Sequence, residues 1–145
     1  MTHILFCHGA TDRLRAAADW LEQAFAQSQP TLVIHTPDET TAARIDQLLW
    51  SASPTGFLPH CRAESPLAEE TPILIVNAST PGEPASGQYL LNLGNDLPPD
   101  YARFPHLIEI ISQEDEVRLP ARNRAKIYRD QGHEVQFRDL QKEPL

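Results

Sequence analysis

Two pairs of neighbouring cysteine and histidine residues could supply ligands to a metal ion. They are Cys7-His8 and His60-Cys61, and thiolate sulfur and imidazole nitrogen are common ligands of Zn²⁺. Neither pair has the Cys-x2-4-Cys or His-x3-5-His spacing that is typical of a structural zinc site, and cysteine is often a small buried hydrophobic residue. We therefore expect no bound metal ion. We also expect both cysteines to stay reduced, because two are too few for a disulfide framework.

Two other groups of side chains could take part in nucleophilic or acid–base catalysis. Ser51 and Ser53 lie in a Ser/Pro/Gly segment close in sequence to His60, but no Gly-x-Ser-x-Gly elbow is present. The acidic run Glu114-Asp115-Glu116 opens a predicted helix, where carboxylates stabilise the free backbone N–H groups and the helix dipole. Neither group forms a convincing catalytic set, so the sequence predicts a protein without catalytic residues and without a cofactor.

The turn after the first predicted strand is a place where an α/β protein often binds a nucleotide. This turn, from Cys7 to Thr11, contains one glycine where the dinucleotide fingerprint requires three, and no P-loop pattern occurs in the chain. A nucleotide- or small-molecule-binding α/β enzyme therefore remains an alternative interpretation that no motif supports. Retention of a nucleotide on purification would favour it.

Basic residues are concentrated in one predicted helix near the end of the chain. Five of the twelve lysines and arginines lie there: Arg118, Arg122, Arg124, Lys126 and Arg129. Because each helical residue turns the side-chain direction by about 100°, all of them except Arg124 fall within an arc of about 80°. The chain has a net charge of −8, which makes a concentrated cationic stripe less expected by chance.

An apolar stripe adjoins the cationic arc on the same helix. Its members are Val117, Ala121, Tyr128 and, at the border, Ala125. Such a surface suits a short acidic peptide with a hydrophobic residue or a terminal carboxylate, because arginine pairs bidentately with carboxylates. Two other interpretations stay open: a solvated helix face, or direct binding of single-stranded DNA, for which only Tyr128 is available as a stacking platform.

A second candidate surface lies between Asp46 and His60, where Trp50 and Phe57 flank a small Ser/Pro/Gly loop. Large aromatic side chains at the edges of a rigid loop are typical anchors of a protein interface. The same two side chains could equally close the hydrophobic core of the domain.

Short apolar runs alternate with amphipathic segments along the chain, which is the pattern of an α/β domain. Strands are predicted at residues 3–7, 31–35, 72–76, 89–93, 106–111 and 133–137. Helices are predicted at about residues 12–29, where Pro30 ends the first, and at 37–50, 100–104 and 114–131. Capping boxes are expected at Thr36 with Glu39 and at Ser112 with Asp115. These elements predict a three-layer α/β/α fold with a largely parallel, Rossmann-like central sheet.

The bulk composition adds further expectations. A chain of 145 residues with 41% apolar content predicts one domain, residues 1–140, followed by a short tail, residues 141–145. The net charge of −8 argues against general binding of duplex DNA, which depends on neutralising phosphates. No apolar run approaches the about 20 residues that span a bilayer and no signal peptide is recognisable, so we expect a cytoplasmic protein.

Two separate blocks of the sequence resemble the chi subunit family of bacterial DNA polymerase III holoenzyme. The first, Asp46-Gln-Leu-Leu-Trp50 through Phe57-Leu-Pro-His60, is similar to the family motif of a helix ending in Leu-Trp and then Phe-Val/Leu-Pro-His. The second block, which resembles the C-terminal helix of the family, consists of Glu114-Asp115, Ala121-Arg122, Lys126, Tyr128-Arg129 and Gly132. Length, order of elements and acidic charge also fit, so the resemblance covers nearly the whole chain.

The resemblance implies a non-catalytic accessory subunit of the replicative polymerase. Members of the family pair with the psi subunit of the clamp loader. They also hold the acidic C-terminal tail, ending in Pro-Phe, of single-stranded DNA-binding protein. By this resemblance, DNA is contacted mainly indirectly, and the chain is a monomer or forms a one-to-one heterodimer with psi.

The resemblance also implies two binding surfaces in this chain. The tail of single-stranded DNA-binding protein would bind at Val117, Arg118, Arg122, Ala125, Lys126 and Tyr128. The psi-facing surface would consist of Trp50, Phe57, Pro59 and His60. Because the family often has an aromatic residue where this chain has Ala125, the pocket for the phenylalanine of the tail is expected to be shallower.

Overall fold

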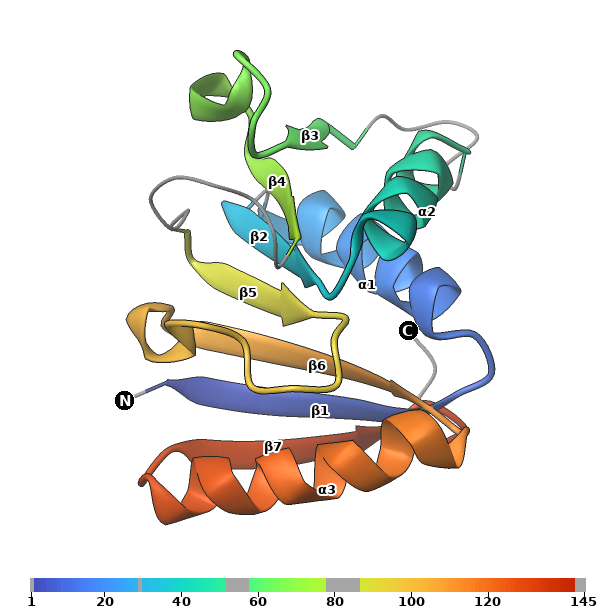
Figure 1. Cartoon of the computed structure of the whole chain (residues 1–145), viewed down its shortest axis with the longest axis vertical. Helices are drawn as coiled ribbons and strands as arrows, with labels where there is room; N and C mark the ends of the chain where they lie inside the picture. Colours follow the sequence, from blue (N-terminus) through green and yellow to red (C-terminus); the bar gives the residue numbers. More distant parts are fainter. Residues whose placement is uncertain (1, 29, 52–57, 78–86, 143–145) are drawn as a thin grey trace.

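A parallel sheet of seven strands forms the centre of the protein (Figure 1). The computed structural model describes residues 2–28, 30–51, 58–77 and 87–142. The strands are β1 (His3–Ala10), β2 (Leu32–Thr36), β3 (His60–Arg62), β4 (Ile73–Asn77), β5 (Tyr89–Asn92), β6 (His106–Ser112) and β7 (Glu134–Asp139). Their order in the sheet is β3-β4-β2-β5-β6-β1-β7, and every neighbouring pair is parallel. β3 and β7 are therefore the two edges.

Helices cover both faces of this sheet. They are α1 (Arg13–Ser28), α2 (Glu39–Ser51) and α3 (Asp115–Asp130), with short 3₁₀ turns η1 (Ala68–Glu70) and η2 (Tyr101–Arg103). The buried side chains of α1 and α2 pack with one apolar cluster, and those of α3 and η2 pack with a second cluster on the opposite face (Figure 1). The predicted three-layer α/β/α fold with a parallel sheet is confirmed. Residues 79–87 contain Pro, Gly and Ser, which predicts a surface loop, and they fall almost entirely outside the described residues.

The inner strands are mainly apolar because both faces of the sheet are covered. Side chains alternate between the two faces along a strand. In β2, Ile34 packs with the cluster of α1 and α2 while Val33 packs with the cluster of α3. In β6, Ile108 and Leu107 divide in the same way. A continuous apolar run therefore predicts these strands better than an alternating pattern does.

Both predicted capping boxes are wrong. Thr36 is the last residue of β2, and its hydroxyl donates a hydrogen bond across the sheet to the carbonyl oxygen of Val76 at 2.9 Å. The cap of α2 is Asp38, whose Oδ1 accepts a hydrogen bond from the backbone N–H of Thr41 at 2.8 Å. The cap lies at Asp38 because β2 continues to Thr36, one residue beyond the predicted strand, and α2 begins only at Glu39.

The second capping box fails in a similar way. Ser112 is the last residue of β6 and is buried, and its hydroxyl donates to the carboxylate of Glu114. Glu114 takes the N-cap position of α3, and its side chain makes no capping hydrogen bond there. The acidic residues Asp115 and Glu116 still occupy the first turn of α3, where they complement the helix dipole.

The two Cys–His pairs lie far apart in the sheet. Cys7 lies in β1 and Cys61 lies in the edge strand β3, with four strands between them. Burial raises the pKa of the Cys7 thiol to about 11, so this side chain behaves as a hydrophobic residue. Within the described ranges, no group of three or more His, Cys, Asp or Glu side chains is placed to hold a metal ion. Nor does any described helix have the length and apolar character needed to cross a membrane.

Candidate functional site

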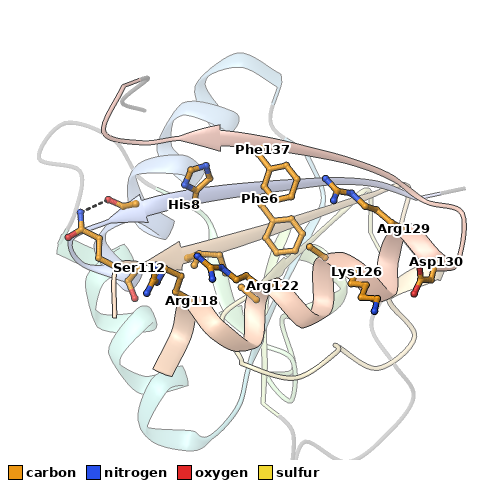
Figure 2. Close-up of a pocket in the computed structure, with 14 residues that line it drawn as sticks. Phe6, His8, Ser112, Arg118, Arg122, Lys126, Arg129, Asp130 and Phe137 are labelled. Atoms are coloured by element: carbon orange, nitrogen blue, oxygen red, sulfur yellow. Dashed lines mark hydrogen bonds between the residues drawn. The ribbon is translucent and has the colours of Figure 1, made fainter. Parts of the chain in front are cut away.

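A groove of about 710 Å³ lies between α3 and the adjoining strands β1, β6 and β7 (Figure 2). Its apolar lining consists of Phe6, Ile111, Ala121, Ala125 and Phe137. Its cationic lining consists of Arg118, Arg122, Lys126 and Arg129. The groove therefore combines an apolar floor with a basic rim, which is the combination that the helix pattern predicted for α3.

The predicted arc of cations on α3 is confirmed. Arg118, Arg122, Lys126 and Arg129 are exposed, whereas Ala121, Ala125 and Tyr128 on the adjoining stripe are buried against the sheet. The helix thus presents its basic side to solvent along one wall of the groove.

The four cations differ in how they are paired. One carboxylate oxygen of Asp115 accepts a hydrogen bond from Arg118 at 2.5 Å, three residues along the helix. The guanidinium of Arg129 lies over the ring of Phe137, 5.1 Å from its centroid. Among the described residues, neither Arg122 nor Lys126 forms a hydrogen bond or ion pair with another. Arg122 and Lys126 are therefore available to an anionic ligand without first losing an internal partner.

A buried ion pair fixes α3 on the sheet. Glu109 of β6 is fully buried, and its two carboxylate oxygens accept hydrogen bonds from Nε and Nη2 of Arg124 at 3.0 Å each. A third nitrogen of Arg124 donates to the carbonyl oxygen of Asn95 at 2.7 Å. Because the guanidinium is planar and bidentate, this contact sets both the position and the rotation of α3. Arg124 points inward to Glu109, whereas the four cations of the groove lie on the exposed side of α3.

Tyr128 belongs to this buried network and does not line the groove. Its side chain is fully buried, and its hydroxyl donates a hydrogen bond to Oε2 of Glu109 at 2.7 Å. Burial, with the nearby charge of Glu109, raises the pKa of Tyr128 far above its usual value, so the phenol stays protonated as a donor. Val117 is half-buried and packs against the apolar cluster beneath α3. Of the six residues predicted to bind the tail, the other four line the groove.

The structure adds aromatic residues to the groove that the sequence pattern did not reveal. Phe6 of β1 and Phe137 of β7 are register partners on neighbouring strands, and their rings stack at a centroid distance of 5.4 Å with an interplanar angle of 22°. Both line the groove. The alternation of Val135 and Phe137 in the last predicted strand was a usable signal, but only the pairing of β7 with β1 places Phe137 opposite α3.

The second candidate surface lies at the other edge of the sheet, where α2 ends and β3 begins. Trp50 is 61% exposed, and its ring centroid lies 4.9 Å from that of His60. His60 is buried: its Nδ1 donates to the carbonyl oxygen of Leu58 at 2.6 Å, and its Nε2 lies 3.1 Å from Oδ1 of Asp46. The structure brings Trp50 and His60 together, with half-buried Pro59 beside them in the chain.

For Trp50 the interpretation as a core residue is wrong, because most of its side chain is exposed. His60 supports this surface from below rather than forming its exposed part. Phe57 lies outside the described residues, as does Ser53. Ser51 is the last residue of α2, and its hydroxyl donates to the carbonyl oxygen of Gln47 within the same helix at 3.2 Å.

Comparison with known proteins identifies the family to which the chain belongs. The chain matches the family model described as DNA polymerase III chi subunit, HolC, over residues 1–136. It is 30% identical over 124 residues to the DNA polymerase III subunit chi of Pseudomonas aeruginosa, covering 86% of this chain and 84% of that protein. It is also 30% identical over 108 residues to the DNA polymerase III subunit chi of Haemophilus influenzae, covering 73% of each protein. The matched region contains the Trp50 surface and all of α3, and it ends one residue before Phe137.

Proposed function

Because the chain belongs to the DNA polymerase III chi subunit family, we propose that this replication accessory subunit acts as an adaptor between two proteins. One is the single-stranded DNA-binding protein, whose acidic C-terminal tail would bind in the groove beside α3. The other is the psi subunit of the clamp loader, which would bind at the surface around Trp50. In this role the chain works in the cytoplasm and carries out no catalysis of its own.

The proposal for the groove depends on one observation: cations without an internal ion-pair partner lie beside an apolar floor. Arg122 and Lys126 form no ion pair within the described part of the chain, and Ala121, Ala125 and Phe137 lie beside them. In a protein with a net charge of −8, an acidic peptide is repelled by most of the surface and attracted only locally. A tail of aspartates ending in phenylalanine matches both parts of this groove.

The position of the two surfaces suits an adaptor. The groove is lined by Phe137 of the edge strand β7, and Trp50 contacts His60, the first residue of the edge strand β3. These two strands lie at opposite edges of the sheet (Figure 1). Six inter-strand spacings of about 4.8 Å separate these edges, or about 29 Å in total. Two partners of ordinary size can therefore bind at the same time without competing for contacts.

The first test is a calorimetric titration of the protein with an acidic peptide that ends in Ile-Pro-Phe. We expect micromolar binding that weakens with added salt, since the cations of the groove are exposed and their attraction is screened. A control peptide without the final phenylalanine is expected to lose most of the affinity. No binding of either peptide would contradict the proposal for the groove.

The proposal for the second surface predicts a large effect of Trp50→Ala on the complex with psi. Aromatic anchors at interfaces often cost about 2 kcal/mol or more when truncated, which is about thirtyfold in affinity. The melting temperature of the isolated protein is expected to change little, because Trp50 is 61% exposed.

Leu119→Ala is the matched control for this experiment, since Leu119 is a large exposed apolar residue on α3, near the opposite edge of the sheet. It is expected to leave the affinity for psi unchanged. Equal binding of psi by the wild type and by Trp50→Ala would contradict the assignment of this surface.

A further inference from the structure

Phe137 is an exposed aromatic residue at the edge of the sheet, and its position is unusual for such a side chain. It is 50% exposed although it lies in a regular strand and on the same face as the buried core beneath α3. Its neighbour on this face, Val135, packs against that core. Phe137 therefore marks the point where the core opens into the groove (Figure 2).

The groove is open because α3 presents small side chains opposite this ring. Ala121 and Ala125 line the helix wall, and each extends only a methyl group from the backbone. The space between helix and strand is left as part of the groove volume of about 710 Å³. A guest side chain of aromatic size can thus enter between α3 and β7 and meet Phe137 there.

The surroundings of Phe137 hold its ring in place. Phe6 stacks against it on the neighbouring strand, with 5.4 Å between ring centroids, and His8 meets it edge-on at 6.3 Å. The guanidinium of Arg129 lies over it at 5.1 Å, a distance within the range of a cation–π contact. A ring that is already ordered loses little conformational freedom when a ligand packs on it.

We propose that Phe137 is the specificity-determining residue of the groove: its ring is the surface against which the terminal phenylalanine of a bound acidic peptide packs. This inference rests on the proposed function and refines it. The cations on α3 attract any acidic peptide, whereas Phe137 distinguishes a peptide that ends in an aromatic residue from one that does not. Aromatic rings attract each other through offset or edge-on contacts in addition to the area they bury, so phenylalanine is preferred to smaller residues.

The test compares two peptides on two proteins by calorimetric titration. The peptides are identical acidic sequences that end in phenylalanine or in alanine, and the proteins are the wild type and Phe137→Ala. We expect the variant to bind the phenylalanine peptide about tenfold more weakly and the alanine peptide as the wild type does. The preference for phenylalanine is thereby lost, while unchanged binding of the alanine peptide shows that the variant is folded.

Two further variants sharpen this result. Phe137→Leu keeps an apolar side chain without a ring and is expected to retain an intermediate preference for the phenylalanine peptide. Leu67→Ala removes an exposed apolar side chain that does not line the groove and is expected to bind both peptides as the wild type does.

The outcomes separate this inference from the proposed function. If the wild type prefers the phenylalanine peptide and Phe137→Ala keeps the same preference, the role of Phe137 is overturned and the groove still stands as the binding site. If the wild type binds neither peptide, both are overturned. If Phe137→Ala instead weakens binding to oligothymidylate and not to the peptide, the ring is a platform for nucleic acid and the inference is overturned in favour of that ligand.

Discussion

Replacing Arg122 by alanine is expected to lower the affinity for the acidic peptide by about ten- to a hundredfold. A charge-assisted hydrogen bond contributes about 1.5–3 kcal/mol when it is partly shielded from water, and the groove provides that shielding once a peptide fills it. Arg122 lines the groove and has no ion-pair partner within the described residues, so the change removes a ligand contact and no internal one. The free energy of unfolding is therefore expected to stay within about 0.5 kcal/mol of the wild type.

The experiment needs a control that removes the same charge elsewhere. Arg44→Ala does so, since Arg44 is exposed on α2, outside the groove. It is expected to bind the peptide as the wild type does. Arg122→Lys is expected to bind with intermediate strength, because lysine keeps the charge and loses the bidentate geometry. Equal affinities of Arg122→Ala and the wild type would show that this part of α3 is only a solvated helix face.

Arg124→Ala is expected to have the largest effect on stability, lowering the free energy of unfolding by about 3–5 kcal/mol. Removing one partner of a buried ion pair leaves the other charge unpaired in a medium of low polarity. Here the remaining charge would be Glu109, which is fully buried and keeps only the hydrogen bonds from Asn92 and Tyr128. Unfolding in urea, followed by circular dichroism, measures the change directly.

The neighbouring variant Asn123→Ala is the matched control, because Asn123 is an exposed residue of the same helix. It is expected to shift the free energy of unfolding by less than about 0.5 kcal/mol. If Arg124→Ala is as stable as Asn123→Ala, the ion pair does not hold α3 on the sheet. A combined Glu109→Leu and Arg124→Met variant is expected to recover part of the loss, since it leaves no unpaired charge behind.

Arg122 and Arg124 lie on the same helix, but we expect the first to affect ligand binding and the second to affect stability. Arg122 and Arg124 are two residues apart, so their side chains point about 200° apart around the helix axis. One faces the groove and the other faces Glu109. Arginine is thus placed to bind a ligand on one side of α3 and forms a buried ion pair with the sheet on the other side.

The sequence by itself determined the α/β architecture of the protein and the side of α3 on which the basic residues lie. Apolar runs such as the one in β4 carry no charged residue and require cover on both faces, which predicts a parallel sheet between helices. The spacing of Arg118, Arg122 and Lys126 placed these cations on one side of α3, and the structure confirms that side as exposed. Both inferences depend on periodicity along a single segment, which any folded context preserves.

Tertiary structure alone decided which residues meet. Tyr128 was predicted at the binding surface from its helical angle, yet its hydroxyl turns inward to Glu109, a residue of an otherwise apolar strand. Thr36 resembled a helix cap, but its hydroxyl bonds across the sheet to Val76. Phe137 enters the groove because β7 pairs in register with β1 and so lies beside Phe6. Each of these contacts joins different segments of the chain. Local periodicity determines the face of an element on which a side chain lies, but it does not determine which residue of another element contacts that side chain.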